Sequence, residues 1–230
     1  MVLSHNDYAQ IRPFTNAYNN RVGFIEADVY LRHDSLLVAH EPDEIVSEKT
    51  LENLYLDSLA ERIKANGGTV YPDANQSLVL MIDLKTEGAQ TIPVLIRVLI
   101  SYPNLVAFKS KLKIVLSGSV PSPAAWNQYP DYLWFDGRPT MTYTSEALKR
   151  VAYISTNFKN YSQWDGIGII SKVEDEKILS LISQVHAIDK PLRFWATPDT
   201  KKAWAYLLER KVDILGTDNV SELCLWLANN

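Results

Sequence analysis

The sequence contains a single cysteine, Cys224, so no disulfide can form within the chain. It lacks any block of lysine and arginine, and its net charge is −4, which argues against nucleic acid or an anionic membrane as the main partner. No apolar run approaches membrane-spanning length, and the run Ile92–Ile96 is interrupted at Arg97. These absences predict a soluble protein with no transmembrane segment.

The start of the chain lacks the charged and apolar regions of a secretory signal, because Met1–Ser4 runs directly into His5–Tyr8. A targeting signal is therefore absent or already removed. We expect a protein that is cytoplasmic, or else secreted or periplasmic after loss of a signal peptide. The sequence leaves its oligomeric state open.

Low-complexity linkers and short repeats are also missing. The 230 residues, of which 47% are apolar and 22% charged, can bury one large core, so we expect one domain over residues 1–230. Short apolar runs alternate with helical patterns, which indicates an α/β protein. The predicted strands are Val2–His5, Phe24–Tyr30, Leu36–His40, Leu78–Lys85, Leu112–Ser117, Tyr132–Asp136, Ala152–Ser155, Arg193–Thr197 and Asp213–Gly216. The predicted helices are Pro13–Asn20, Leu51–Asn66, Ala89–Ser101, Ala124–Gln128, Glu174–Ala187, Thr200–Arg210 and Val220–Ala228.

Two observations favour a (β/α)8 TIM-type barrel over an open doubly wound sheet. No Gly-x-Gly-x-x-Gly motif follows the first strand, so a dinucleotide-binding sheet would lack its phosphate loop. Reactive side chains also lie at the carboxyl ends of the first four predicted strands: His5, then Glu26 and Asp28, then His40, then Asp83 and Lys85. In a barrel these ends converge on one mouth, which would bring all six groups together.

Two carboxylates on the second predicted strand are the most informative feature of the chain. Side chains alternate along a strand, so Glu26 and Asp28 point the same way from Phe24–Tyr30. An unpaired buried carboxylate is costly to keep ionised, so the pair needs protons, cations or open solvent. A divalent metal ion meets this need. The alternative is a solvated edge strand, against which the weak β-propensity of aspartate counts.

Asp83 and Lys85 repeat this two-residue spacing on Leu78–Lys85. A third carboxylate completes a hard oxygen set, which suits Mg²⁺ or Ca²⁺ better than Zn²⁺ or copper. Lys85 supplies a point charge for an anion that the metal also contacts. The alternative interpretation is a surface ion pair between Asp83 and Lys85, which would contribute little stability.

Two histidines each close a short apolar strand. His5 and His40 can give or take a proton near neutral pH, so as a pair they could act as base and acid. His33 is typical of a turn and His186 of an amphipathic helix, so neither is a candidate. A metal ion, a lysine and two proton-transfer groups match phosphodiester cleavage, in which an anionic phosphorus centre is neutralised while one oxygen loses a proton and another gains one.

These motifs make the chain similar to the phospholipase-C-like phosphodiesterase superfamily, which includes glycerophosphodiester phosphodiesterases, phosphoinositide phospholipases C and sphingomyelinase-D-like enzymes. Ser4–Tyr8 resembles the His-Asn opening of the phosphoinositide enzymes, and Ile25–Val29 resembles the Glu-x-Asp strand of the superfamily. Met81–Thr86 is similar to the sphingomyelinase-D version of the next motif. Arg193–Thr197 resembles the tryptophan segment of the seventh strand, and Ile214–Asp218 the closing strand. The closest overall likeness is to a single-domain branch of the superfamily.

The resemblance implies a (β/α)8-type barrel with one divalent cation, Ca²⁺ or Mg²⁺. It implies three roles for site residues: acid/base catalysis by His5 and His40, metal ligation by Glu26, Asp28, Asp83 and Asn6, and substrate binding by Lys85 and Trp195. We therefore predict a metal-dependent phosphoric diester hydrolase acting on a glycerophosphodiester or a (lyso)phospholipid. Which histidine is the acid stays open, as does the choice between hydrolysis and a cyclic-phosphate product.

Two alternatives from other classes remain. Glycerophosphodiesterases usually open with His-Arg-Gly where this chain has Asn6 and Asp7, and such departures are compatible with a catalytically silent barrel that binds a phosphorylated ligand. An enolase-like metal-dependent lyase would use Lys85 as its base. That chemistry usually spreads its metal carboxylates over three successive strands, whereas Glu26 and Asp28 share one.

Overall fold

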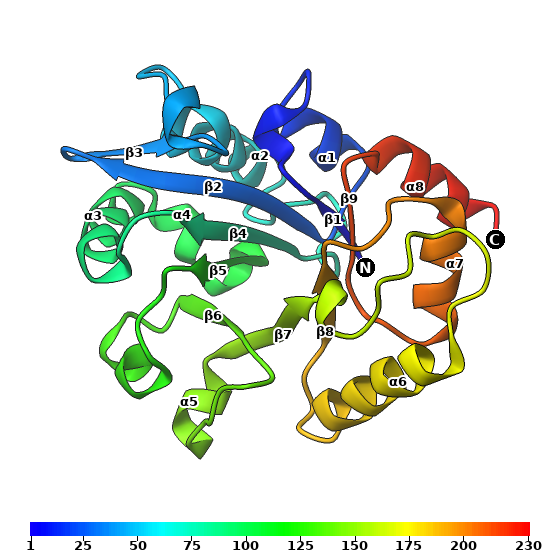
Figure 1. Ribbon diagram of the computed structural model, residues 1–230. Coiled ribbons are helices and arrows are strands. Elements are labelled where there is room, and N and C mark those ends of the chain that lie inside the picture. The colour runs from blue at the N-terminus through cyan, green and yellow to red at the C-terminus, as the bar shows by residue number, and fades with distance from the viewer.

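A computed structural model describes all 230 residues of the chain. It is a nearly closed barrel of eight parallel strands with helices on the outside, which confirms the predicted TIM-type fold (Figure 1). The barrel strands are β1 (Val2–Ser4), β2 (Phe24–Arg32), β4 (Leu78–Leu84), β5 (Leu112–Gly118), β6 (Leu133–Gly137), β7 (Val151–Asn157), β8 (Leu192–Trp195) and β9 (Leu215–Thr217). Their spatial order is β8-β7-β6-β5-β4-β2-β1-β9, and β8 meets β9 through an isolated bridge between Arg193 and Ile214.

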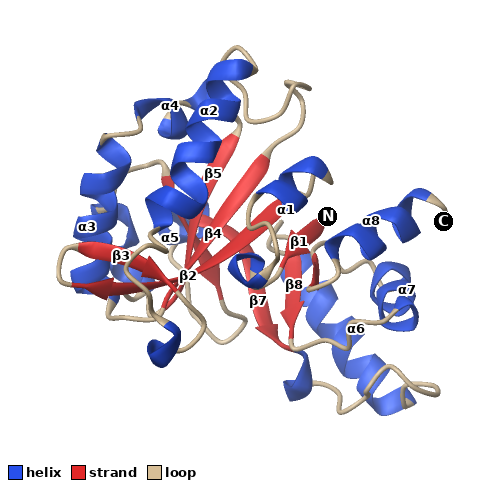
Figure 2. Ribbon diagram, turned by 90° about the horizontal axis from the view of Figure 1, so that it is seen from above, coloured by secondary structure: helices blue, strands red, loops and turns tan.

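The outer layer is made of helices that surround the barrel. The longer helices are α2 (Asp57–Ala65), α3 (Gly88–Ile100), α6 (Lys172–His186), α7 (Lys201–Glu209) and α8 (Val220–Ala228), and the short ones are α1 (Thr15–Asn19), α4 (Pro103–Val106) and α5 (Ser145–Lys149). Figures 1 and 2 both show α3 on the flank opposite α6, α7 and α8. Helices α6 and α7 begin where the hydroxyls of Ser171 and Thr200 accept backbone N–H bonds, as N-cap residues do. None of the helices is long and apolar enough to cross a membrane.

The two faces of strand β2 pack into different cores. Ile25 and Ala27 of β2 belong to the large core between the strands and the helices. Phe24, on the other face, belongs to a small core inside the barrel. Because side chains alternate along the strand, Glu26 and Asp28 lie on the same face as Phe24 and point into the barrel. The predicted division of β2 between an apolar face and a carboxylate face is thus confirmed.

The prediction that Leu36–His40 is a barrel strand was wrong. The segment forms β3 (Ser35–Val38), which runs antiparallel to β2 and lies outside the barrel order. His33, with a φ of 53°, lies in the turn between the two strands, as expected. The apolar run of a hairpin strand is the same as that of a barrel strand, so the sequence pattern could not separate them. The hairpin brings the chain back toward β2, where the N–H of Ala39 donates to the carbonyl oxygen of Asp28.

The smaller differences between the predicted elements and the structure concern short helices. The segment predicted as a helix over Ala124–Gln128 is a 3-10 helix over Pro123–Gln128. Residues Glu52–Leu56 form a π-helical segment that continues into α2. Helices α4 and α5 were not predicted, because four or five residues carry too little periodicity to be recognised.

Candidate active site

All eight predicted site residues line one pocket of about 330 Å³ at the carboxyl ends of the barrel strands. They are His5, Asn6, Glu26, Asp28, His40, Asp83, Lys85 and Trp195. Five further residues, none of them predicted as site residues, complete the lining: Ser117, Asp136, Arg138, Ser155 and Arg193. The convergence expected of a barrel mouth is therefore present, and it includes His40 although β3 is not a barrel strand.

Lys85 joins two of the carboxylates. The register of β2 and β4 places Asp28 beside Asp83. Lys85 Nζ lies 2.9 Å from Asp28 Oδ2 and 2.5 Å from Asp83 Oδ2. Burial opposes the charge on Lys85, but the two carboxylates outweigh it and raise the pKa of the lysine above its ordinary value. Lys85 is therefore held as a cation inside the pocket rather than in an exposed surface pair.

Tyr8 connects the loop after β1 to Asp28 and His40. Its hydroxyl lies 2.7 Å from Asp28 Oδ2, 2.8 Å from Asn6 Oδ1 and 3.2 Å from His40 Nδ1. Burial, followed by the charge of Asp28, raises the pKa of Tyr8 well above its ordinary value, so the hydroxyl stays protonated. His40 Nδ1 also lies 3.3 Å from Asp28 Oδ2. Tyr8 was not predicted as a site residue, because a tyrosine three residues after a histidine is not a recognised motif.

Glu26 is paired with a buried arginine. The Glu26 and Arg193 side chains are 10% and 4% exposed, and Arg193 Nη2 donates to Glu26 Oε2 at 3.0 Å. Burial raises the pKa of Glu26, and the charge of Arg193 offsets only part of this effect. Arg193 Nη1 also lies 3.2 Å from Met81 Sδ, inside the barrel. Arg193 precedes Trp195 by two residues on β8, and this spacing could have identified it as a second inward-facing side chain.

A buried network around Asp136 forms the wall of the pocket on β5, β6 and β7. Asp136 Oδ2 accepts hydrogen bonds from Ser117 Oγ and Ser155 Oγ, both at 2.8 Å, and lies 2.7 Å from Arg138 Nη1. Burial raises the pKa of Asp136, with Arg138 acting in the opposite direction. Asp136 and Arg138 lie at the carboxyl end of β6, so the rule that singled out Glu26 would also have found them.

His5 is oriented by an acidic residue that follows β9. His5 Nδ1 lies 2.8 Å from Asp218 Oδ1. Burial opposes protonation of the ring, but the hydrogen bond to Asp218 and the charge of Glu26 outweigh it and raise the pKa of His5. Asp218 thereby favours the imidazolium form of His5.

We expect Asp218→Asn to lower the pKa of His5, because the amide keeps a polar partner but removes the negative charge that favours the imidazolium. The measurement is an NMR titration of the four histidine side chains. His186, which pairs with Asp213 at 2.8 Å, serves as the internal control and should titrate as in the unchanged protein. An unchanged His5 titration would show that Asp218 does not set its protonation.

The chemistry of the pocket fits a hard divalent cation. Its donors are carboxylate and amide oxygens, the ligands that Ca²⁺ and Mg²⁺ prefer. Asp28 Oδ1 is buried and has no hydrogen-bond partner, which is costly for a carboxylate oxygen and would be relieved by a cation. In this arrangement Lys85 and Arg193 are the nearest partners of the carboxylates, and no three acidic, histidine or cysteine side chains lie at metal-ligating spacing.

The fold and the pocket define a class of protein: a parallel (β/α)8 barrel that presents histidines, carboxylates and a lysine at its carboxyl mouth. Residues 1–105 match the family model of the AIM6-like phosphodiesterase domain. This match to a phosphodiesterase domain covers a little less than half of the chain and agrees with the resemblance that the motifs carry. The matched segment contains every predicted site residue except Trp195.

Two curated relatives are similar to this chain. The "Altered inheritance of mitochondria protein 6 homolog" of Arthroderma benhamiae is 32% identical over 116 residues, which cover 43% of this chain and 37% of that protein. The "Altered inheritance of mitochondria protein 6" of Kluyveromyces lactis is 30% identical over 158 residues, which cover 52% of this chain and 38% of that protein. The matched part thus spans less than half the length of these relatives.

Solved structures share the whole fold. A glycerophosphodiester phosphodiesterase from Parabacteroides distasonis superimposes with a TM-score of 0.62 at 13% identity, covering 99% of this chain and 97% of that chain. A phosphodiesterase from Oleispira antarctica, solved with the product sn-glycerol-3-phosphate, gives a TM-score of 0.61 at 12% identity, covering 99% and 96%. At these identities the likeness establishes the fold.

Proposed function

We propose that the chain is a metal-dependent phosphodiester hydrolase that uses His5 and His40 as its acid/base pair. The observation that carries the proposal is the convergence of both histidines, Lys85 and the carboxylates of β2 in one pocket. The substrate that fits best is a glycerophosphodiester or a (lyso)phospholipid, by analogy with the solved phosphodiesterases of the same fold.

The charges of the pocket support a requirement for a cation. Its lining contains four carboxylates, on Glu26, Asp28, Asp83 and Asp136, and three basic side chains, on Lys85, Arg138 and Arg193. With neutral histidines this leaves an excess of one negative charge, and protonation of His5 only cancels it, so the side chains alone do not attract a phosphodiester. A divalent cation gives the pocket a net positive charge and makes binding of a monoanion favourable.

The residues that would hold this cation are Glu26, Asp28 and Asp83, with Asn6 as an amide ligand. When bound, a divalent cation would neutralise a phosphoryl oxygen and lower the pKa of an attacking water or substrate hydroxyl. Lys85 adds a second positive charge at the same carboxylates, since it lies within hydrogen-bonding distance of Asp28 and Asp83. It would thereby orient the phosphodiester as well as neutralise it.

The two histidines have different partners, which suits two different proton transfers. His5 is polarised toward its protonated form by Asp218, so it is suited to protonate a departing alkoxide. His40 is half exposed and is held by Asp28 and Tyr8 through Nδ1, which leaves Nε2 to meet the nucleophile. We propose His5 as the acid and His40 as the base of the first step.

The test is a panel of glycerophosphocholine, glycerophosphoinositol, lysophospholipids and sphingomyelin, assayed with Mg²⁺, with Ca²⁺ and with EDTA. We expect turnover with one of the two metals and its loss in EDTA. Phosphorus NMR of the products would distinguish a phosphomonoester from a cyclic phosphate. A heat-denaturation series gives a readout that is independent of activity, because an ion that binds only the folded chain raises its Tm. Full activity in EDTA, together with no Tm shift from either ion, would contradict the proposed dependence on a metal ion.

The surroundings of Lys85 count against the lyase alternative. A lysine base must lose its proton near neutral pH, whereas Asp83 and Asp28 raise the pKa of Lys85 and hold it charged. The silent-barrel alternative makes a different prediction for the same panel: a Tm shift with metal and phosphodiester together, but no product with any substrate.

A further inference from the structure

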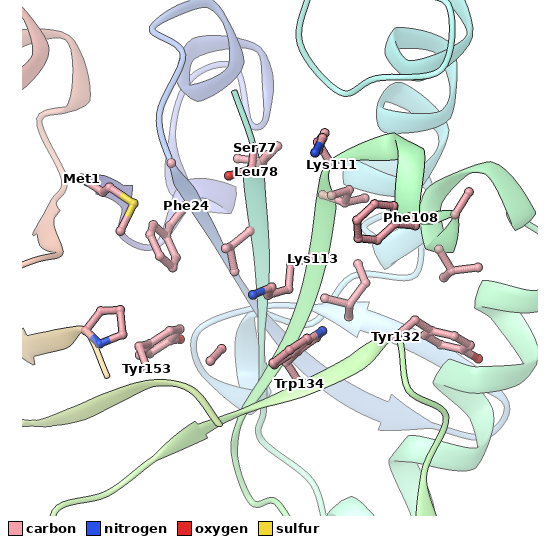
Figure 3. Close-up of a pocket in the computed structure, with 18 of the residues that line it drawn as sticks. Met1, Phe24, Ser77, Leu78, Phe108, Lys111, Lys113, Tyr132, Trp134 and Tyr153 are labelled. Atoms are coloured by element: carbon pink, nitrogen blue, oxygen red, sulfur yellow. The ribbon is translucent and has the colours of Figure 1, made fainter. Parts of the chain in front are cut away.

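A second pocket lies at the opposite end of the barrel. Its volume is about 620 Å³, and it opens among the amino ends of the strands, where Phe24, Leu78 and Leu112 are the first residues of β2, β4 and β5. Figure 3 shows Phe24 and Tyr153 on one side of it and Phe108 and Tyr132 on the other. It shares no lining residue with the candidate active site, so we call it the lower pocket.

The walls of the lower pocket are apolar. Thirteen of its 19 lining residues are hydrophobic, which favours an occupant with a substantial apolar part. Phe108 at its edge is 94% exposed, and Met1 is 60% exposed. Such exposure of large apolar side chains beside a cavity marks a surface that an apolar ligand would cover. The volume lies within the range of about 300–1,000 Å³ that is usual for small-molecule sites.

One basic side chain inside this pocket has no acidic partner. Lys113 Nζ lies 4.0 Å from the centre of the Trp134 ring and forms no ion pair with a carboxylate, and Figure 3 shows the two side chains together between the walls. Burial, followed by the charge of Lys190, lowers the pKa of Lys113. The one acid in the lining, Asp131, is at the surface and lies 3.6 Å from Arg150 Nη1. A half-buried cation without a counter-ion favours an anionic ligand.

We propose that the lower pocket binds a single-chain aliphatic carboxylate. The chain lies against the apolar walls, and the carboxylate pairs with Lys113 above the face of Trp134. Lys111, at the exposed edge of the same pocket, adds a second positive charge toward the solvent. An uncharged chain of the same length would bury the same apolar area but leave Lys113 without a partner.

The lower pocket is separated from the active site by the small core inside the barrel. Tyr153 lines the pocket, and its hydroxyl lies 2.6 Å from Met81 Sδ. The same sulfur lies 3.2 Å from Arg193 Nη1. The carboxylate site is therefore distinct from the phosphodiester site, and its occupation can be measured without turnover.

The test is calorimetric titration of the intact chain with sodium dodecanoate, below the concentration at which it forms micelles, and with dodecan-1-ol. We expect saturable binding of one dodecanoate per chain. Lys113→Met keeps the apolar stem and removes the charge, so it should weaken dodecanoate binding about tenfold or more, as loss of a charge-assisted contact does. The alcohol should bind Lys113→Met and the unchanged chain alike. Lys202→Met, on the exposed surface of α7, is the matched control and should bind dodecanoate normally.

A second variant checks the location. Ala152→Trp adds a large ring to the lining and should abolish binding of both ligands, with heat denaturation showing that each variant is folded. Three outcomes overturn the proposal: no saturable dodecanoate binding, equal dodecanoate affinity in Lys113→Met, or binding that survives in Ala152→Trp. If Ala152→Trp does not fold, the Lys113→Met comparison decides alone.

Discussion

His40→Gln should lower kcat for phosphodiester hydrolysis by about 10²- to 10⁴-fold, the range that a general acid–base group contributes. Asp28 and Tyr8 fix one ring nitrogen of His40, and Nε2 has only Glu41 Oε1 nearby, at 3.8 Å. Glutamine can still form hydrogen bonds but cannot take up a proton near neutral pH. Steady-state kinetics on the substrate identified by the phosphodiester panel would measure the effect.

The chain offers a matched control for this substitution. His33→Gln changes the same residue type in the exposed turn of the β2–β3 hairpin and should leave kcat unchanged. His5→Gln should lower kcat by a factor in the same range as His40→Gln does. The double variant should be little worse than either, because groups that act as a unit are not additive. A loss in His33→Gln as large as in His40→Gln would point to the hairpin rather than to the imidazole of His40.

Arg193→Met should destabilise the metal-free fold by about 3–5 kcal/mol, the cost of removing one partner of a buried ion pair. Burial already raises the pKa of Glu26, and loss of Arg193 raises it further. In the variant, the Glu26 carboxyl then loses its proton at a lower pH in the unfolded chain than in the folded chain. The loss of stability therefore grows as the pH rises above the pKa that Glu26 has in the unfolded chain. Urea denaturation at pH 5 and pH 8, in EDTA, would measure the effect.

A surface pair provides the control for this second prediction. Arg97 lies 3.1 Å from Asp34, and the two side chains are 62% and 84% exposed. Arg97→Met should therefore cost less than about 1 kcal/mol. Replacing both partners in the barrel, with Glu26→Leu and Arg193→Met together, should recover part of the lost stability. Equal losses from Arg193→Met and Arg97→Met would contradict the assigned role of the buried pair.

Much of the barrel and its mouth could be predicted from local pattern. Glu26 and Asp28 interrupt an apolar strand at the spacing that puts both on one face. That strand cannot bury both carboxylates unless a cation or a proton neutralises them. Because parallel strands end at a common mouth, the same rule predicts that they lie beside His5, Asp83 and Lys85. Periodicity and strand direction are enough to predict that such residues lie at the barrel mouth.

The parts that were not predicted depend on contacts between distant segments. Leu36–Val38 carries the pattern of a barrel strand, and only its pairing with β2 shows that it turns back. Arg193 is 167 residues from Glu26 along the chain, so no local signal connects them. Asp136 and Arg138 could have been found by the rule already in use, but an Asp-Gly-Arg segment on a short strand also matches an ordinary turn.

The closure of the barrel has a consequence for how the molecule opens. Strands β4 and β5 pair over seven registered positions, whereas β8 and β9 meet at the bridge between Arg193 and Ile214. Backbone amides along this last junction should exchange with solvent sooner than those of β4, because fewer bonds must break to free them. Arg193 both closes the ring of strands and neutralises Glu26. A fluctuation that separates β8 from β9 would therefore disassemble the candidate active site while most of the barrel stays folded.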